Sequence, residues 1–102
     1  MRRYAVLLTC SAFATSGALA QSVPRYNIDK ICDAARANPI GSPETVYAEC
    51  IRDETHARQQ LEEHWDNFSA QSLETCVPME PSPSTSSYTY VLTCLQEENS
   101  KQ

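Results

Sequence analysis

Residues 32–54 read CDAARANPIGSPETVYAECIRDE, and residues 76–98 follow the same pattern as CVPMEPSPSTSSYTYVLTCLQEE. A shift of 44 residues places the two cysteines, one proline and one serine of the first segment on those of the second, and both segments read C-x6-P-x2-S-x7-C-[IL]-[RQ]-[DE]-E. So many identical spacings indicate an internal duplication, in which one supersecondary unit is used twice.

Each unit has the pattern of a helical hairpin. Ile28, Ile31, Cys32 and Ala35 form one apolar stripe, which predicts a helix over 27–37 that ends before Pro39. An N-cap Ser42, a proline at 43 and an acid at 44 predict a second helix from Pro43 to about Asn67. The second unit predicts a short helix, which Ser69 or Ser72 caps and Pro78 stops, and a helix over 87–98 with a frayed end.

These patterns predict an all-α fold made of two disulfide-stapled antiparallel helical hairpins, a tandem repeat with four helices. The units span about 27–67 and 69–98 of a single small domain over 21–102. No segment alternates with period two for long enough to propose a strand.

The cysteines at 32, 50, 76 and 94 are expected to form two disulfides, because their number is even and the chain is small. Cys32 and Cys50 lie about equally far from the turn of their hairpin, so an antiparallel pair of helices brings them level. The repeat extends this pairing to Cys76–Cys94. A crossed arrangement, Cys32–Cys94 with Cys50–Cys76, remains the alternative.

Residues 1–20 have the features of a secretory signal peptide. Arg2 and Arg3 precede an apolar run, and Ala18-Leu19-Ala20 is a cleavage pattern of small residues, so we expect an exported protein, periplasmic or secreted, that starts at Gln21. The apolar run is shorter than the roughly 20 residues of a membrane span, and no span is expected. Without Arg2 and Arg3 the charge falls from −5 to about −7.

Composition argues against several classes of function. Two glycines leave little from which to build a phosphate-binding loop, and an acidic chain is a poor partner for nucleic acid. His56 and His64 lie about 12 Å apart along a helix, too far to share a metal ion. No catalytic residue, metal site or cofactor is expected, and the chain is not expected to be an enzyme.

Glu54 is a carboxylate on the apolar stripe of its helix, and the repeat places Glu98 at the equivalent position. Arg58, four residues after Glu54 on the same stripe, is its expected partner in a structural ion pair. For Glu98 the only nearby basic residue is Lys101 in the tail, so we expect its partner to come from another segment or to be absent.

The two Cys…Cys-x-x-[DE]-E units behind a signal peptide resemble a group of small exported proteins of alphaproteobacteria. The resemblance covers most of residues 26–98. It implies a helical fold and a periplasmic location, and it implies no activity.

The function expected from these observations is non-catalytic binding of an envelope protein through the acidic face of the second helix. The candidate binding residues are Glu49, Asp53, Glu63 and Asp66. An acidic face is also what solubility alone would produce. The alternative function is a small-molecule or metal carrier, suggested by the two histidines and a cleft between the hairpins.

Overall fold

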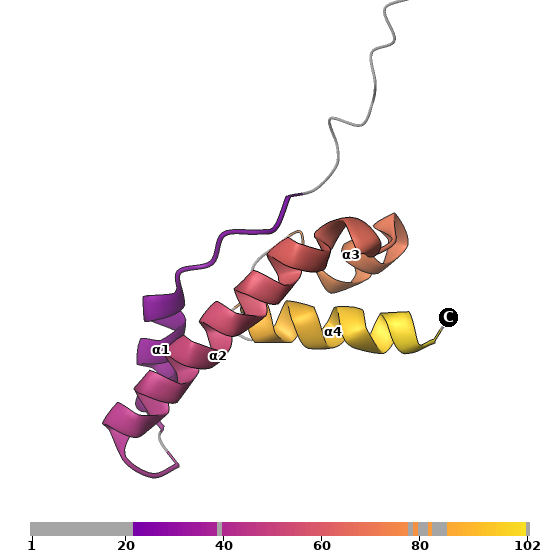
Figure 1. The fold of residues 1–102 in the computed structure, drawn as a ribbon. Helices are drawn as coiled ribbons and strands as arrows, with labels where there is room; N and C mark the ends of the chain where they lie inside the picture. The colour runs from indigo at the N-terminus through magenta and orange to yellow at the C-terminus, as the bar shows by residue number, and fades with distance from the viewer. Residues whose placement is uncertain (1–21, 39, 78, 80–81, 83–85, 102) are drawn as a thin grey trace, which may run out of the picture.

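The computed structural model describes residues 22–38, 40–77, 79, 82 and 86–101, and within them the fold is all-α (Figure 1). The elements are α1 (Ile28–Arg36), α2 (Pro43–His64), the 3-10 turn η2 (Trp65–Asn67), α3 (Ala70–Cys76) and α4 (Tyr88–Ser100). The predicted fold class is confirmed. The predicted signal peptide, residues 1–20, lies outside the described residues.

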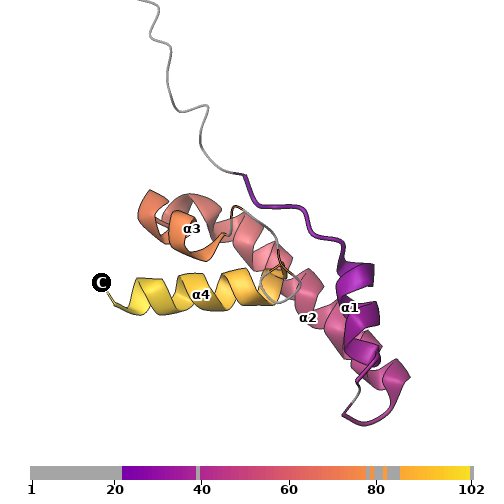
Figure 2. The ribbon, with the colours of Figure 1, turned by 180° about the vertical axis from the view of Figure 1, so that it is seen from behind.

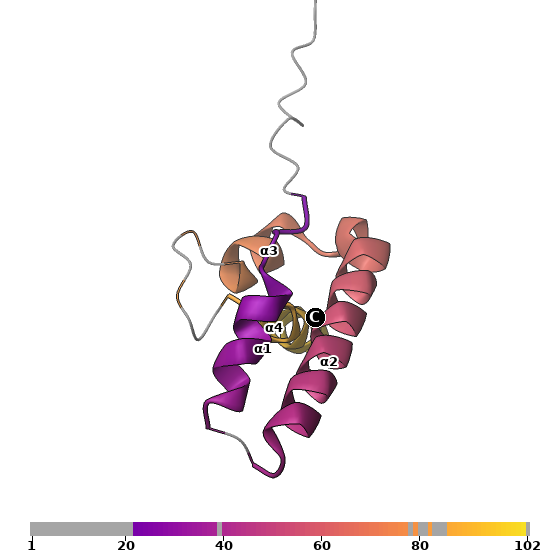
Figure 3. The same cartoon turned by 90° about the vertical axis from the view of Figure 1, so that its left-hand side faces the viewer.

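The helices form two hairpins, α1 with the long α2 and α3 with α4. α1 lies beside the first part of α2, and α3 lies near its other end (Figure 2). α4 crosses α2 at a steep angle, so it is seen nearly end-on when α1 and α2 are viewed side by side (Figure 3). Contacts of α2 with both α1 and α4 make α2 the link between the two units.

Both predicted disulfides are present. Cys32–Cys50 joins α1 to α2, and Cys76–Cys94 joins α3 to α4, with the same Cα–Cα distance of 5.5 Å in each pair. The crossed pairing is therefore wrong. Equal spacing in the two units has produced the same staple twice.

Helix starts follow the expected capping residues with one exception. Asn27 Oδ1 accepts from the Lys30 N–H at 3.0 Å, and Ser69 Oγ accepts from the Ser72 N–H at 3.1 Å. Ser42 occupies the N-cap position of α2, but its hydroxyl donates to Glu44 at 3.3 Å instead of capping the helix. Proline at the first position of α2 removes one of the N–H groups that a cap would satisfy.

The turn between α1 and α2 contains Gly41 with φ of +105°. This backbone conformation is readily available only to glycine, which explains one of the two glycines in the chain.

The end of α4 differs from the prediction, because the helix continues to Ser100 instead of fraying after Glu98. Ser100 Oγ donates to the Glu97 carbonyl at 2.8 Å, and Lys101 Nζ lies 3.0 Å from Glu98 Oε1. These local contacts satisfy groups that would otherwise be open at the helix end.

The hydrophobic core lies where α2, α3 and α4 meet. Leu61, Val91 and Leu95 are fully buried, and half-buried Ile28 and Leu92 pack against the cluster. α1 is different, since Cys32 is its one buried residue. The core therefore belongs mainly to the second half of the chain. Its buried members are Ala57, Leu61, Trp65, Cys76, Tyr88, Val91 and Leu95.

Candidate functional site

The four candidate binding residues are all exposed. Glu49, Asp53 and Glu63 lie on α2, and Asp66 follows in η2. At a rise of 1.5 Å per residue, Glu49 and Glu63 are about 21 Å apart along the helix. The structure therefore spreads these exposed carboxylates along α2 and η2, a set that we call the α2 acidic row, and does not gather them into one pocket.

Two members of the α2 acidic row have basic neighbours. Asp53 Oδ1 lies 3.3 Å from Arg52 Nε, and Glu63 Oε2 lies 3.9 Å from His64 Nε2. Both contacts are exposed, and exposed ion pairs contribute only about 0–1 kcal/mol. Among the described residues, Glu49 and Asp66 have no ion pair. The row remains open to a partner.

The Glu54 carboxylate is buried, with 3% of the residue exposed, and it binds the start of α4. Its Oε2 accepts from the Tyr88 N–H at 2.7 Å, and its Oε1 accepts from the Thr89 N–H at 3.3 Å and the Thr89 hydroxyl at 2.6 Å. Ser87 Oγ accepts from the Tyr90 N–H at 3.0 Å. The first three N–H groups of α4 are thus satisfied, two of them by a residue 34 to 35 positions away.

A carboxylate at this point is favourable for two reasons. The open N–H groups at the start of a helix need acceptors, and the helix dipole places partial positive charge there. Glu54 is therefore a remote N-cap that ties the second helix of unit one to the second helix of unit two.

The expected pair of Glu54 with Arg58 is wrong. Arg58 Nε lies 3.8 Å from Glu62 Oε1, one turn further along α2, and Glu54 turns toward α4 instead. The Glu54 carboxylate accepts hydrogen bonds from three donors at the start of α4, and it does not pair with the half-exposed guanidinium of Arg58. That Glu54 has a structural partner was correctly inferred, but its identity depended on where α4 lies.

Glu98, the repeat equivalent of Glu54, pairs with the nearby Lys101 and not with a residue of another segment, so the expectation that Lys101 would not be its partner is wrong, and its side chain is 27% exposed. No helix start lies against it among the described residues. The same motif position has thus acquired a tertiary role in one unit and a local role in the other.

The histidines do not form a metal centre with their neighbours. His56 Nε2 lies 3.4 Å from Gln60 Nε2 on the same helix, and His64 lies beside Glu63. Within the described part of the chain, no group of three or more His, Cys, Asp or Glu side chains is arranged to hold a metal ion. The metal-carrier alternative gains no support from these contacts.

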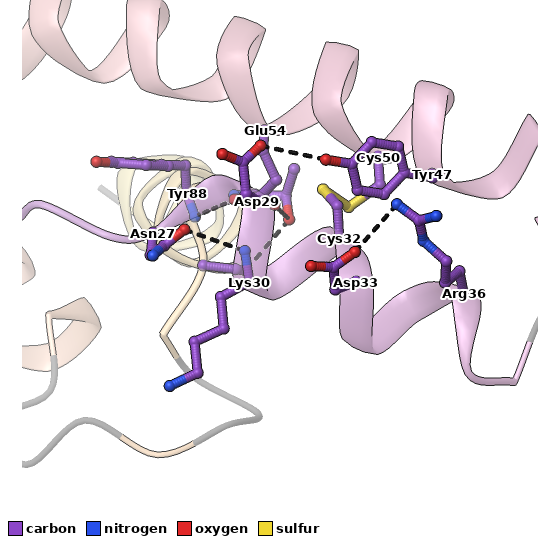
Figure 4. Close-up of a disulfide and its surroundings, with 12 residues drawn as sticks. Asn27, Asp29, Lys30, Cys32, Asp33, Arg36, Tyr47, Cys50, Glu54 and Tyr88 are labelled. Atoms are coloured by element: carbon purple, nitrogen blue, oxygen red, sulfur yellow. Dashed lines mark hydrogen bonds and ion pairs between the residues drawn. A yellow bond between two sulfur atoms is a disulfide. The ribbon is translucent and has the colours of Figure 1, made fainter. Parts of the chain in front are cut away.

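A polar cluster beside the first disulfide joins α1 to α2 (Figure 4). The Tyr47 hydroxyl donates to Asp29 Oδ1 at 3.2 Å, the Arg36 guanidinium lies 3.8 Å from the centre of the Tyr47 ring, and Arg36 pairs with Asp33 at 3.0 Å. Desolvation, the hydrogen bond to Asp29 and the nearby acidic charges raise the pKa of Tyr47, while Arg36 lowers it by a smaller amount. The cluster is a cross-link of the hairpin.

Tyr88 connects a third segment to the same region. Its hydroxyl accepts from the Tyr26 N–H at 2.9 Å, and the two rings meet edge to face with centres 5.0 Å apart. Desolvation, with a smaller effect of Tyr88, raises the pKa of Tyr26. Tyr88 therefore holds the segment before α1, as well as α2, against the start of α4.

The two disulfides fit an oxidising compartment outside the cytoplasm. Among the described residues, no helix combines the length and apolar character needed to cross a membrane.

Sequence reasoning found the acidic row and the staples, but it missed the remote cap. Two features of the sequence could have indicated this cap. Glu54 is a carboxylate on the apolar stripe of its helix, and Ser87 directly precedes another helix. Comparisons of the chain with family models, with curated proteins and with solved structures gave no match.

Proposed function

We propose that the protein is exported to the bacterial envelope, where it acts without catalysis and binds a basic surface of an envelope protein through the α2 acidic row. The observation that supports this most directly is that Glu49, Asp53 and Glu63 are exposed on α2, a helix that packs against both α1 and α4, and that Asp66 is exposed directly after it. A helix backbone that is already held in place loses little conformational freedom when a partner binds.

The charge of the chain supports the same proposal. The net charge is −5 over the whole sequence and about −7 without residues 1–20. An acidic protein attracts basic surfaces at long range, and that attraction weakens as the Debye length shortens from about 10 Å at 0.1 M salt to about 3 Å at 1 M.

Charge reversal tests the proposal with a matched control. In Asp53→Lys/Glu63→Lys, capture of a partner from envelope extract should fall about tenfold or more at low salt, because steering by charge is lost. The control Glu74→Lys/Glu97→Lys changes the net charge equally at exposed carboxylates of α3 and α4. Capture by the control should stay close to that of the unmodified protein.

The salt dependence gives a second readout. Binding by the unmodified protein should weaken with salt, and binding by Asp53→Lys/Glu63→Lys should depend on salt less steeply. Equal loss in both double variants, or capture that no salt concentration changes, would show that the row is ordinary solvated surface.

Export has its own test. Protein recovered from the periplasm should have the intact mass of a chain that starts at Gln21. A mass that retains residues 1–20, or that includes lipid on Cys10, would contradict cleavage after Ala20.

A further inference from the structure

A pocket of about 510 Å³ opens at the start of α1, on a different element from the α2 acidic row. Asn27, Lys30, Ile31 and Ala34 line it at spacings of three and four residues, so they share one helix face. Lys30 extends from α1 on the side away from α2 (Figure 4). The remaining lining residues are Arg25, Tyr26, Ser82 and Ser86.

The basic residues of the chain distinguish this pocket from the rest of the surface. Four of the six Lys and Arg residues in the described part form ion pairs with carboxylates, namely Arg36, Arg52, Arg58 and Lys101. The other two, Arg25 and Lys30, have no ion pair with any described residue, and both line the pocket. On an acidic protein, this is a local site of positive charge.

The start of α1 adds to that charge. The dipole of the helix places partial positive charge at its N-terminus. The acid of the first turn, Asp29, is held by the Tyr47 hydroxyl from α2. An anion in the pocket would therefore meet Arg25, Lys30 and the helix end together.

The walls of the pocket are partly apolar. The half-buried side chains of Tyr26 and Ile31, together with Ala34, offer carbon surface between the basic residues. A ligand with an apolar body and an anionic group would match both the carbon surface and the basic residues of the pocket.

We propose that this pocket binds an amphipathic organic anion, a carboxylate attached to an alkyl or aryl body. The volume lies within the range of about 300–1,000 Å³ that is typical of small-molecule sites. The carboxylate pairs with Arg25 and Lys30, and the apolar body lies against Tyr26, Ile31 and Ala34. The proposal is independent of the α2 acidic row, which lies on another helix.

Calorimetric titration of the full mature chain with four probes tests the ligand class. Octanoate should bind, and 1-octanol, octyltrimethylammonium and inorganic phosphate should each bind at least about tenfold more weakly. Absence of octanoate binding would overturn the proposal. If octanol or octyltrimethylammonium bound as tightly as octanoate, the requirement for an anionic group would be refuted. If phosphate bound as tightly as octanoate, the requirement for an apolar body would be refuted.

Variants test the location. Arg25→Gln/Lys30→Gln should weaken octanoate binding about tenfold, because the carboxylate loses both of its charged partners. Arg52→Gln/Lys101→Gln removes the same charge outside the pocket and should leave the affinity within about twofold. If both double variants weakened octanoate binding equally, the effect would come from net charge alone, and the assignment of the site to this pocket would be overturned.

A third variant tests the apolar wall. Ala34 is exposed on α1, so Ala34→Phe should fold normally, which circular dichroism checks, and should narrow the pocket. Octanoate affinity should fall severalfold. Unchanged affinity in a folded Ala34→Phe variant would place the ligand elsewhere and overturn the assignment.

Discussion

The two hairpins have the same cysteine spacing and the same 5.5 Å staple, yet they differ in how much side-chain packing supports them. α1 buries only Cys32, whereas α4 buries Tyr88, Val91 and Leu95. In unit one the disulfide and the Tyr47 cluster hold a thin pair of helices together. In unit two the staple lies within a hydrophobic core. A duplicated sequence pattern thus determines the geometry of the disulfides, but it does not determine how many buried core residues each helix contributes.

Glu54 and Glu98 show the same contrast at one motif position. Glu54 is buried and caps α4, and Glu98 is partly exposed and contacts Lys101. The start of α4 packs against α2, the second helix of unit one. Within the described residues, no helix start packs against Glu98 on α4, the second helix of unit two. Tertiary surroundings, and not the motif, give the carboxylate its role.

The largest effect should come from the hydrophobic core, to which α4 contributes three buried residues and α1 none. Leu95→Ala removes a fully buried side chain and should lower the free energy of unfolding by about 2–5 kcal/mol. Ile31→Ala, at a half-buried position of α1, should cost about 1 kcal/mol. Urea unfolding measures both. Equal losses would contradict the unequal division of the core.

Removing each disulfide in turn should show which helices depend on it for their stability. Each disulfide closes a loop of about 19 residues, which corresponds to about 3 kcal/mol in the chain-entropy model. In Cys32→Ala/Cys50→Ala, hydrogen exchange should show lost protection mainly in α1. In Cys76→Ala/Cys94→Ala the loss should extend over α2, α3 and α4. The same exchange pattern in both variants would show that unit one does not depend more on its staple.

Glu54, the remote cap, should contribute more to the stability of the fold than Glu98, its repeat equivalent. Glu54→Ala leaves buried N–H groups of Tyr88 and Thr89 without their acceptor and should cost about 1–3 kcal/mol. Glu98→Ala removes one partly exposed ion pair and should cost less than 1 kcal/mol. Thermal melts compare the two variants. A Glu54→Ala melt that matches the unmodified protein would exclude a stabilising cap.

The smallest effect should appear only at alkaline pH. Because burial raises the pKa of Tyr26 above the ordinary tyrosine value of 10.0, the folded state favours the neutral phenol. The resulting stability is fully present below pH 10 and is lost as pH rises through the folded pKa. Tyr26→Phe should leave neutral stability nearly unchanged and lessen the alkaline loss.

Tyr47→Phe provides the comparison in unit one. The pKa of Tyr47 is also raised, but its hydroxyl additionally donates to Asp29, so this variant should lose a contact at neutral pH as well. Unfolding followed across the pH range measures both variants. Identical pH profiles for Tyr26→Phe and the unmodified protein would show that Tyr26 titrates alike in both states.

Several features could be predicted from the sequence because their causes are local. Apolar periodicity, caps such as Asn27 and Ser69, and the proline at 43 mark the helices over short windows. The equal cysteine spacing determined the pairing, since two antiparallel helices bring equidistant positions level. The exposed positions of the α2 acidic row followed from the same periodicity.

Only the tertiary structure decided which helix starts and charges meet. The steep crossing of α4 over α2 places Tyr88 and Thr89 at Glu54, and no local pattern encodes that angle, because side-chain packing at Ala57, Leu61 and Val91 determines it. Likewise, Arg25 joins Lys30 at the pocket because Tyr88 holds the segment before α1. Helix periodicity depends on near neighbours, whereas crossing angles and pockets depend on residues far apart in the chain.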